Sequence, residues 1–282
     1  MSKIFGKSCI VTGGGSGIGR SLCEELASSG ARAIYVVDIN PFAVEVSKNL
    51  PALATHPHFR HGFHVADVGQ EEDVKKVIYT AWTLFDTVDA YFSNAGILEM
   101  GGVDEKEVSN DDWGYVWNVN VMSSIFAARQ LLPLWKSNNY RDGIFVITAS
   151  AVGLLGTIAT MPYHVSKHAA VAVADWLAIT YEGISVHCIC PNVVRTNMIK
   201  RSAELMEKVV PEALDDLVEP RDVAVATINA IDDGTFLVLP HPKIEKQFVH
   251  KAMNYDQWIN SMRKLQKRLD DVNRVNSLHS KL

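Results

Sequence analysis

The chain has 282 residues, of which 48% are hydrophobic, and this composition supports a sizeable core and excludes a disordered chain. The net charge is −5 and basic residues do not cluster, which argues against a surface that binds nucleic acid. No stretch approaches the ~18 consecutive apolar residues of a membrane span, so we expect no span.

Seven short apolar segments alternate with helix-length segments along the chain. Most of them end at Gly, Asp, Asn or Pro, and such runs separated by helices indicate a parallel sheet that is covered on both faces. They are SCIVTG (8–13), AIYVVD (33–38), GFHVAD (62–67), DAYFSN (89–94), GIFVITAS (143–150), SVHCICPN (185–192) and TFLVLP (235–240). The pattern predicts an α/β Rossmann fold, a doubly wound parallel sheet of about seven strands, over residues 1–243.

A glycine-rich loop, TGGGSGIG (12–19), joins the first of these strands to a helix predicted over Ile18–Ser29. Glycines at this spacing let the backbone turn and approach a pyrophosphate, and the helix N-terminus supplies N–H donors. The second strand ends in Asp38, the acid that such a motif requires. We therefore predict a dinucleotide site whose loop contacts are Gly13, Ser16, Gly17, Ile18 and Gly19.

Asp38 also favours one cofactor. Its carboxylate can accept hydrogen bonds from both ribose hydroxyls but repels a 2′-phosphate. Ile39 and Asn40 offer no cation to that phosphate, and Arg20 lies on the helix, where solubility or packing explains it. NAD(H) is therefore predicted over NADP(H).

Tyr163 and Lys167 lie four residues apart, and Tyr163 directly follows Pro162 in the chain. A proline can begin a helix without the loss of a needed N–H donor. This spacing alone also fits an ordinary exposed helix edge. A free phenol titrates near pH ~10, so tyrosine is a base at neutral pH only when its anion is stabilised. Lys167, one turn along the helix, places a cation on the same face and favours acid–base chemistry.

In this order the motifs resemble those of the short-chain dehydrogenase/reductase family, in its compact single-domain branch, over roughly residues 4–240. Besides the glycine loop and the Tyr–Lys pair, Ser150 precedes Tyr163 by the family's thirteen residues. The other matching segments are Asp67-Val68, Ser93-Asn94-Ala95-Gly96, Trp113 to Asn120, and Pro191 to Thr196.

The resemblance implies an NAD-dependent oxidoreductase that interconverts a secondary alcohol and its ketone. Tyr163 is then the acid/base, Ser150 holds the substrate oxygen, and Lys167 also binds the nicotinamide ribose. Asn120 is implied to hold a water that connects Lys167 to solvent. The implied cofactor contacts outside the loop are Asp38, Asp67, Val68, Asn94, Ala95, Gly96, Tyr163, Lys167, Val194 and Thr196. A homo-oligomer, dimer or tetramer, is implied as well.

Two positions depart from the family pattern. Ser93 replaces an asparagine, and Asn192 replaces a glycine. Asparagine tolerates a left-handed backbone better than most residues, so we expect the turn at Asn192 to survive. Among nearby polar groups we interpret His164 and His168 as exposed helix residues rather than proton relays, and Thr148 as a strand residue. No metal site is evident, and we expect the four cysteines to be free and buried.

The predicted substrate pocket is largely apolar. It is expected to involve Val152–Leu155, Asn94–Met100 and the stretch from Met198 to about Val218, including Leu205 and Met206. An apolar or lipid-like alcohol fits such walls, although Arg195, Lys200 and Arg201 are either solvated or available to an acidic group. The alternative function is a non-catalytic NAD(H)-binding sensor or scaffold.

Residues 244–282 are predicted as a C-terminal extension that is not independent of the main domain. Trp258, Met262, Leu265 and Leu269 form one stripe of a helix over 257–271, which we expect to dock on its own domain or on a neighbouring subunit. Residues 272–282 are predicted as a solvated tail, and they end in Ser280-Lys281-Leu282. This ending is a peroxisomal address if the source is a eukaryote; otherwise we expect a cytoplasmic protein.

Overall fold

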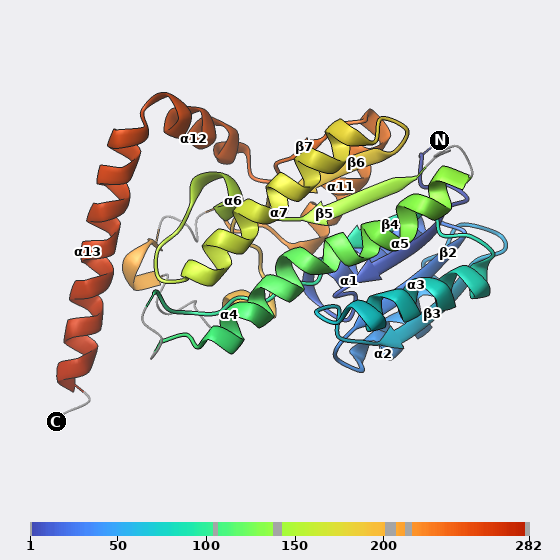
Figure 1. The fold of residues 1–282 in the computed structure, drawn as a ribbon, viewed down its shortest axis with the longest axis horizontal. Helices are drawn as coiled ribbons and strands as arrows, with labels where there is room; N and C mark the ends of the chain where they lie inside the picture. The colour runs from blue at the N-terminus through green and yellow to red at the C-terminus, as the bar shows by residue number, and fades with distance from the viewer. Residues whose placement is uncertain (1, 104–106, 138–142, 201–206, 212–215, 280–282) are drawn as a thin grey trace.

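Seven parallel strands form a single sheet in the computed structural model, which describes residues 2–103, 107–137, 143–200, 207–211 and 216–279 (Figure 1). The strand order is β3-β2-β1-β4-β5-β6-β7. The strands are β1 (Ser8–Thr12), β2 (Ala33–Asp38), β3 (Arg60–Val65), β4 (Ala90–Ser93), β5 (Ile144–Thr148), β6 (Ser185–Ile189) and β7 (Leu237–Val238). This arrangement confirms the predicted doubly wound Rossmann fold.

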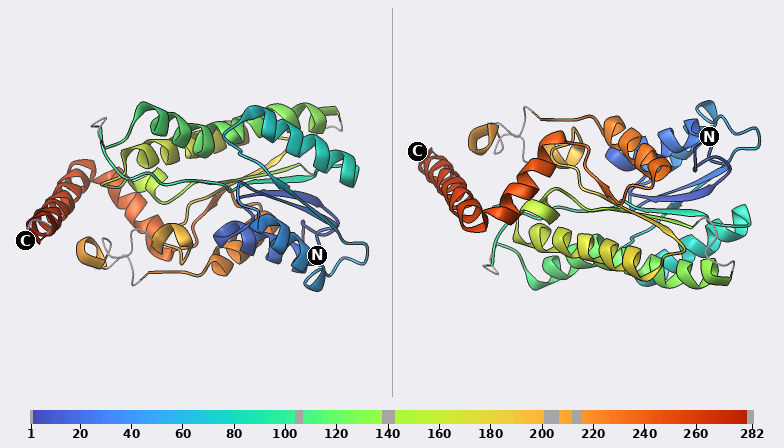
Figure 2. Two further views of the ribbon diagram at one scale, coloured as in Figure 1. Left: turned by 90° about the horizontal axis from the view of Figure 1, so that it is seen from below. Right: turned by 90° about the horizontal axis from the view of Figure 1, so that it is seen from above.

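Helices cover both faces of the sheet (Figure 2). The helices α3 (Glu71–Phe85), α5 (Ser123–Ser137) and α7 (Met161–Thr180) pack on one face. On the other face lie α1 (Gly17–Ser28), α2 (Phe42–Asn49) and α11 (Pro220–Asp233). The remaining helices are α4 (Asn110–Trp117), a π-helical turn (Asn118–Met122), α6 (Val152–Leu155), α8 (Asn197–Lys200), α12 (Pro242–Met253) and α13 (Tyr255–His279), with a 3₁₀ turn at Leu50–Ala52.

Two apolar clusters separated by the sheet form the core. Ile10, Tyr91 and Phe145 point to the side of α3, α5 and α7. Val11 and Phe92, which follow two of them in the chain, point to the opposite side. Successive strand residues alternate between faces, so strands buried on both faces are continuously apolar, as the sequence shows.

The C-terminal region differs from its prediction. A helix that the sequence did not indicate, α12, precedes α13, and α13 begins at Tyr255 and continues to His279. The predicted tail is therefore wrong as far as His279, because residues 272–279 contain no Gly or Pro to end the helix. Residues 280–282 lie outside the described residues. In the part of the chain that is described, no helix is long and apolar enough to cross a membrane.

The hydroxyl of Thr12 joins the ends of β1 and β4, where the chain order of the strands reverses. It accepts hydrogen bonds from the backbone N–H groups of Asn94 (3.0 Å) and Ala95 (3.1 Å), and it donates one to the carbonyl of Phe92 (3.2 Å). Thr12 is 1% exposed. One hydroxyl therefore uses its donor and both of its acceptor sites to fix this edge of the sheet.

Thr12→Val is expected to lower the free energy of unfolding by about 2–4 kcal/mol, because it leaves two partly buried N–H groups without an acceptor. Thr227→Val is the matched control, since the hydroxyl of that buried residue donates only to the helix carbonyl of Val223. The control should cost less than about 1 kcal/mol. Urea unfolding of the two variants measures both values, and equal losses would contradict the role given to Thr12.

Candidate active site

The glycine loop between β1 and α1 has no room for side chains at its critical positions. Gly13 and Gly17 have φ values of 65° and 51°, which favour glycine. A Cβ atom on Gly19 would lie 2.0 Å from the carbonyl oxygen of Gly13. The predicted contacts Gly13, Ser16, Gly17, Ile18 and Gly19 all line one cavity. The loop therefore forms a bare backbone cradle at the N-terminus of α1, as a pyrophosphate site requires.

Asp38 lies at the end of β2 and braces this loop. Its carboxylate accepts hydrogen bonds from the backbone N–H groups of Gly15 and Asn40, both at 2.9 Å. Each oxygen keeps acceptor capacity that faces the cavity, which Asp38 also lines. Arg20, the nearest competing cation in the sequence, is paired with Glu24 at 2.8 Å.

Asp67 and Val68 follow β3 and line the same cavity. The Asp67 carboxylate accepts a hydrogen bond from the N–H of Gly69 (2.9 Å) and lies 3.5 Å from the hydroxyl of Tyr115. The sequence did not single out Tyr115, which reaches this pocket from α4. Burial and the nearby Asp67 carboxylate raise the pKa of the Tyr115 phenol.

Asn94 connects the glycine loop to Thr148 and, through Thr148, to Lys167. Its side-chain amide donates to the carbonyl of Thr12 (2.9 Å), and its amide oxygen accepts from the hydroxyl of Thr148 (3.2 Å). The carbonyl of Thr148 in turn accepts a hydrogen bond from Lys167 (2.9 Å). Thr148 is a strand residue, as expected, and it is also the link between these two groups.

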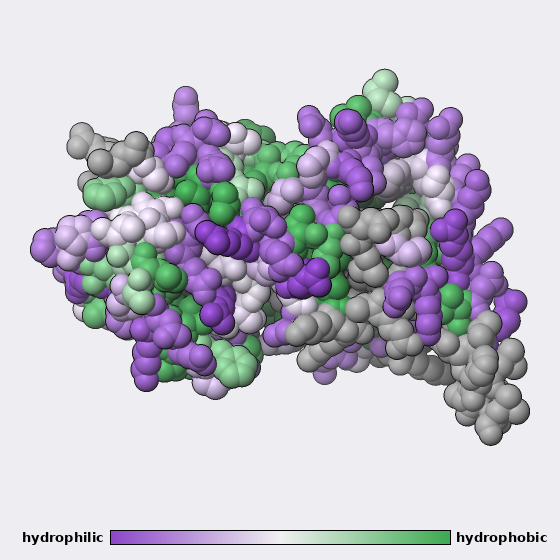
Figure 3. Space-filling model, turned by 180° about the vertical axis from the view of Figure 1, so that it is seen from behind, coloured by the Kyte–Doolittle hydropathy of each residue, from purple (hydrophilic) through white to green (hydrophobic). Residues whose placement is uncertain are grey.

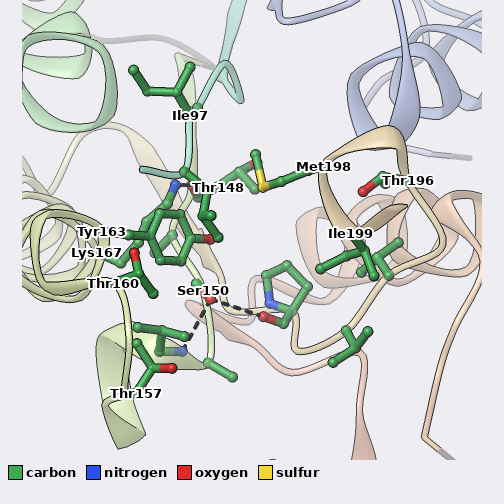
Figure 4. A pocket seen from close by; sticks show the side chains of 18 of the residues that line it. Ile97, Thr148, Ser150, Thr157, Thr160, Tyr163, Lys167, Thr196, Met198 and Ile199 are labelled. Carbon is green, nitrogen blue, oxygen red and sulfur yellow. Dashed lines mark hydrogen bonds between the residues drawn. The ribbon is translucent and has the colours of Figure 1, made fainter. Parts of the chain in front are cut away.

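Ser150 and Tyr163 face each other across the end of β5 and the start of α7 (Figure 4). The hydroxyl of Ser150 accepts from the N–H of Val152 (3.1 Å) and donates to the carbonyl of Pro191 at 3.4 Å, a long contact. Burial raises the pKa of the Tyr163 phenol, and its hydrogen bond with Ser150 lowers that pKa.

Lys167 is buried one turn along α7 from Tyr163. Its ammonium lies 5.6 Å from the centre of the Tyr163 ring and donates to Thr148, so it contacts the tyrosine through the ring rather than the hydroxyl. Burial lowers the pKa of Lys167 to about 8. The sequence pattern placed the cation correctly on this face, but it did not indicate how strongly burial opposes both charges.

Asn120 reaches the site from the π-helical turn Asn118–Met122. Its amide donates to the carbonyl of Ile97 (2.9 Å) and to the hydroxyl of Ser166 (3.0 Å), and its oxygen accepts from the N–H of Ile97 (2.9 Å). A Cβ atom on Gly96 would lie 3.3 Å both from that oxygen and from the Lys167 nitrogen. Both N–H groups of the Asn120 amide are thus used. Its oxygen, beside Lys167, can still accept one more hydrogen bond.

The segment from Pro191 to Thr196 closes the cavity opposite α7. Thr196 packs against the glycine loop, since its methyl group would lie 3.1 Å from a Cβ on Gly17, and Val194 is buried. Asn192 does not use the left-handed backbone that asparagine tolerates, since it is not among the residues with positive φ. The turn is held instead by the fully buried His241 ring, which accepts from the N–H of Asn192 (3.1 Å) and bonds the carbonyl of Val193 (3.0 Å).

Three further polar positions received sequence interpretations. His164 and His168 are partly buried rather than exposed, with rings stacked 4.7 Å apart, and His164 accepts a hydrogen bond from the N–H of Thr157. Ser93, which replaces the family's asparagine, shares a hydrogen bond of 2.8 Å with Ser124. All four cysteines are free and buried, as predicted.

The cavity that contains these groups has a volume of about 550 Å³ and runs from Asp38 to α13. Ile97, Met198 and Ile199 surround the catalytic side chains (Figure 4). Trp258 and three further residues of α13 line it as well, which the sequence did not indicate. Arg201, Leu205 and Met206, which were expected near the pocket, lie outside the described residues.

Comparison with known proteins identifies the family of this chain. A family profile described as short chain dehydrogenase matches residues 7–207. The chain belongs to this family. It is therefore an oxidoreductase of the short-chain dehydrogenase type, with the family's order of motifs from the glycine loop to Tyr163.

Two curated short-chain dehydrogenase relatives and one solved structure are similar over most of their length. A 2,5-dichloro-2,5-cyclohexadiene-1,4-diol dehydrogenase from Sphingobium indicum is 32% identical, covering 84% of this chain and 94% of the relative. A meso-2,3-butanediol dehydrogenase from Serratia marcescens is 28% identical, covering 82% and 90%. The structure of a Burkholderia phymatum short-chain dehydrogenase/reductase in complex with NAD is 26% identical, with a TM-score of 0.79 and coverage of 91% and 96%.

Gly19→Ala is expected to weaken NAD binding at least about tenfold, because the added methyl group collides with the loop backbone. Gly114→Ala is the matched control: this exposed glycine of α4 has no atom within 4 Å of the added Cβ. It should leave the dissociation constant within about twofold. Calorimetric titration with NAD measures both variants, and tight binding by Gly19→Ala would refute the cradle.

Proposed function

We propose that this protein is an NAD-dependent oxidoreductase that interconverts an apolar secondary alcohol and its ketone, with Tyr163 as the acid/base. The observation that carries the proposal is the convergence of Tyr163, Ser150 and Lys167 on one cavity whose other end is the glycine loop. The names of the two curated relatives, both diol dehydrogenases, support the reaction type.

The residues present fit NAD. The loop provides a cradle that a Cβ on Gly19 would fill, and Asp38 offers a carboxylate where a 2′-phosphate would need a cation. Lys167 would bind the ribose near the nicotinamide, and Thr196 and the Val194 backbone would hold its carboxamide. When bound, the nicotinamide supplies the hydride acceptor for alcohol oxidation and the hydride donor for ketone reduction.

Tyr163 and Ser150 divide the work at the substrate oxygen. In oxidation, the Tyr163 oxygen accepts the hydroxyl proton as the hydride leaves the carbinol carbon; in reduction, it returns the proton to the forming alkoxide. The Ser150 hydroxyl can turn from its long contact with Pro191 to donate to the substrate oxygen. The hydrogen bond that the Ser150 oxygen accepts from the N–H of Val152 keeps this oxygen in place during the turn.

Lys167 and Asn120 support the tyrosine. Burial disfavours the phenolate, so positive charge nearby must compensate, and Lys167 supplies it while it remains protonated. The free acceptor site of the Asn120 oxygen lies next to Gly96 and Lys167. We propose that it positions a water there, which carries the proton onward from the lysine.

Tyr163→Phe is expected to lower kcat for alcohol oxidation by about 10²–10⁴, because it removes the proton acceptor, while NAD still binds. In the native protein, kcat/KM for oxidation should rise with pH, about tenfold per unit below the apparent pKa of Tyr163, because burial raises that pKa and only the phenolate accepts a proton. Nicotinamide absorbance follows both. The control is Tyr79→Phe, at a tyrosine that is 73% exposed.

Full activity of Tyr163→Phe would exclude this tyrosine as the acid/base. If the native protein binds NAD tightly but reacts with no secondary alcohol or ketone in a broad screen, the non-catalytic sensor or scaffold replaces the enzyme.

Asp38→Ala is expected to shift the ratio of kcat/KM for NAD to that for NADP at least about tenfold toward NADP, because it removes the charge that repels the 2′-phosphate. Asp111→Ala, at an exposed acid of α4, is the control and should leave the ratio unchanged. Thermal melting of Asp38→Ala checks that the loop survives the loss of its two hydrogen bonds. A preserved preference in a folded variant would contradict the proposal.

Two properties of the whole protein are also proposed. The first is a homo-oligomer, and an apolar groove between α5 and α7 supports it, where Trp176 is 57% exposed. The second, for a eukaryotic source, is targeting to peroxisomes through Ser280-Lys281-Leu282. Light scattering of the purified chain tests the first, and the location of a fluorescent fusion, with and without the tripeptide, tests the second.

A further inference from the structure

The C-terminal helix α13 lies away from the sheet (Figures 1 and 2), and its side chains line the cavity. It follows α12, which continues from the last strand, and Trp258, Met262, Leu265 and Leu269 of α13 line the same cavity as Tyr163 and Ser150. All four are apolar and recur on one face of the helix. The stripe therefore faces the reaction site of its own chain.

Two hydrogen bonds attach α12 and α13 to the short helix α6. The ammonium of Lys251 donates to the carbonyl of Leu154 (2.7 Å), and the indole N–H of Trp258 donates to the carbonyl of Leu155 (3.1 Å). Both carbonyls belong to α6, which begins two residues after Ser150. The position of α13 is thus set relative to the residue that would hold the substrate oxygen.

The stripe is only partly covered by protein. Leu269 is 5% exposed, whereas Trp258, Met262 and Leu265 are of intermediate exposure because they border the cavity. Arg263, Lys264 and Lys267 occupy the outer face, and hydrophilic residues dominate the right-hand edge of Figure 3, where α13 runs. The helix therefore has one solvent-exposed polar face and one apolar face, and the apolar face lines the cavity.

Apolar residues also form much of the cavity wall outside α13, interrupted by Thr157, Thr160 and Asn197. These apolar residues are Ile97, Leu98, Met100, Ile158, Met198, Ile199, Val209 and Val210. Ser150 and Tyr163 line the same cavity, and α13 adds only apolar side chains to it. A ligand that occupies this space needs an oxygen beside Ser150 and Tyr163 and hydrocarbon toward α13.

We propose that α13 is the far wall of the substrate site and selects alcohols with an extended, uncharged hydrocarbon part over short ones. The inference rests on the proposed function and adds the substrate class and the residues that set it. Each methylene that leaves water for this wall gains about 0.8 kcal/mol, which is up to about fourfold in kcat/KM.

The test is a series of 2-alkanols from 2-butanol to 2-dodecanol, oxidised with NAD by the full chain. For the native protein, kcat/KM should rise with chain length, mainly through a lower KM. Leu265→Asn, which replaces a cavity-facing leucine by an amide of similar size, should cut kcat/KM for 2-dodecanol at least about tenfold and change 2-butanol less than about twofold. Ile259→Asn is the matched control on the same helix, at a residue that is 37% exposed and absent from the cavity wall.

The outcomes separate this inference from the proposed function. If 2-butanol is oxidised and the dependence on chain length is flat, or equal in native protein and Leu265→Asn, the wall is refuted and the enzyme stands. If no alkanol reacts, calorimetric binding of 2-dodecanone decides instead: weaker binding to Leu265→Asn than to Ile259→Asn upholds the wall, and equal or absent binding overturns it.

Discussion

One hydrogen-bonded chain, beginning at the hydroxyl of Thr12, holds the two halves of the site in register. Thr12 ties the end of β1 to the end of β4, Asn94 passes the connection to Thr148 on β5, and the Thr148 carbonyl receives Lys167 from α7. These groups are at least partly shielded from water, where an unmade hydrogen bond is costly. The glycine loop and Lys167 therefore share one hydrogen-bonded frame.

Much of this frame could be predicted because its signals are local. Parallel strands buried on both faces must be apolar throughout, so the strands and the fold class are visible in the sequence. The glycines of the loop are dictated by backbone crowding, and the spacing of Tyr163 and Lys167 is one helical turn. The loop glycines and the Tyr163–Lys167 pair therefore lie where their spacing in the chain predicted.

The features that escaped prediction depend on distant partners. His241 supports Asn192 from a position 49 residues later, and nothing near either residue announces the contact. Asn120 points inward from a π-helical turn, a geometry that no 3.6-residue periodicity reveals. The effect of burial on Tyr163 and Lys167 also emerges only once other segments enclose them. The stripe of α13 was recognised as amphipathic and docks on its own domain, as predicted, but the sequence did not show that it also lines the cavity.

The hydrogen bonds that attach α12 and α13 to α6 have a consequence for how such a protein can diverge. Both acceptors are main-chain carbonyls of α6, so they survive any replacement of the Leu154 and Leu155 side chains that preserves the helix. Mutations in α13 at positions other than Trp258 can accordingly alter the shape of the cavity wall while Ser150, Tyr163 and Lys167, which lie on other elements, stay in place. Substitutions at Met262 and Leu265 could therefore change the substrate preference of related proteins step by step, without an intermediate that has lost activity.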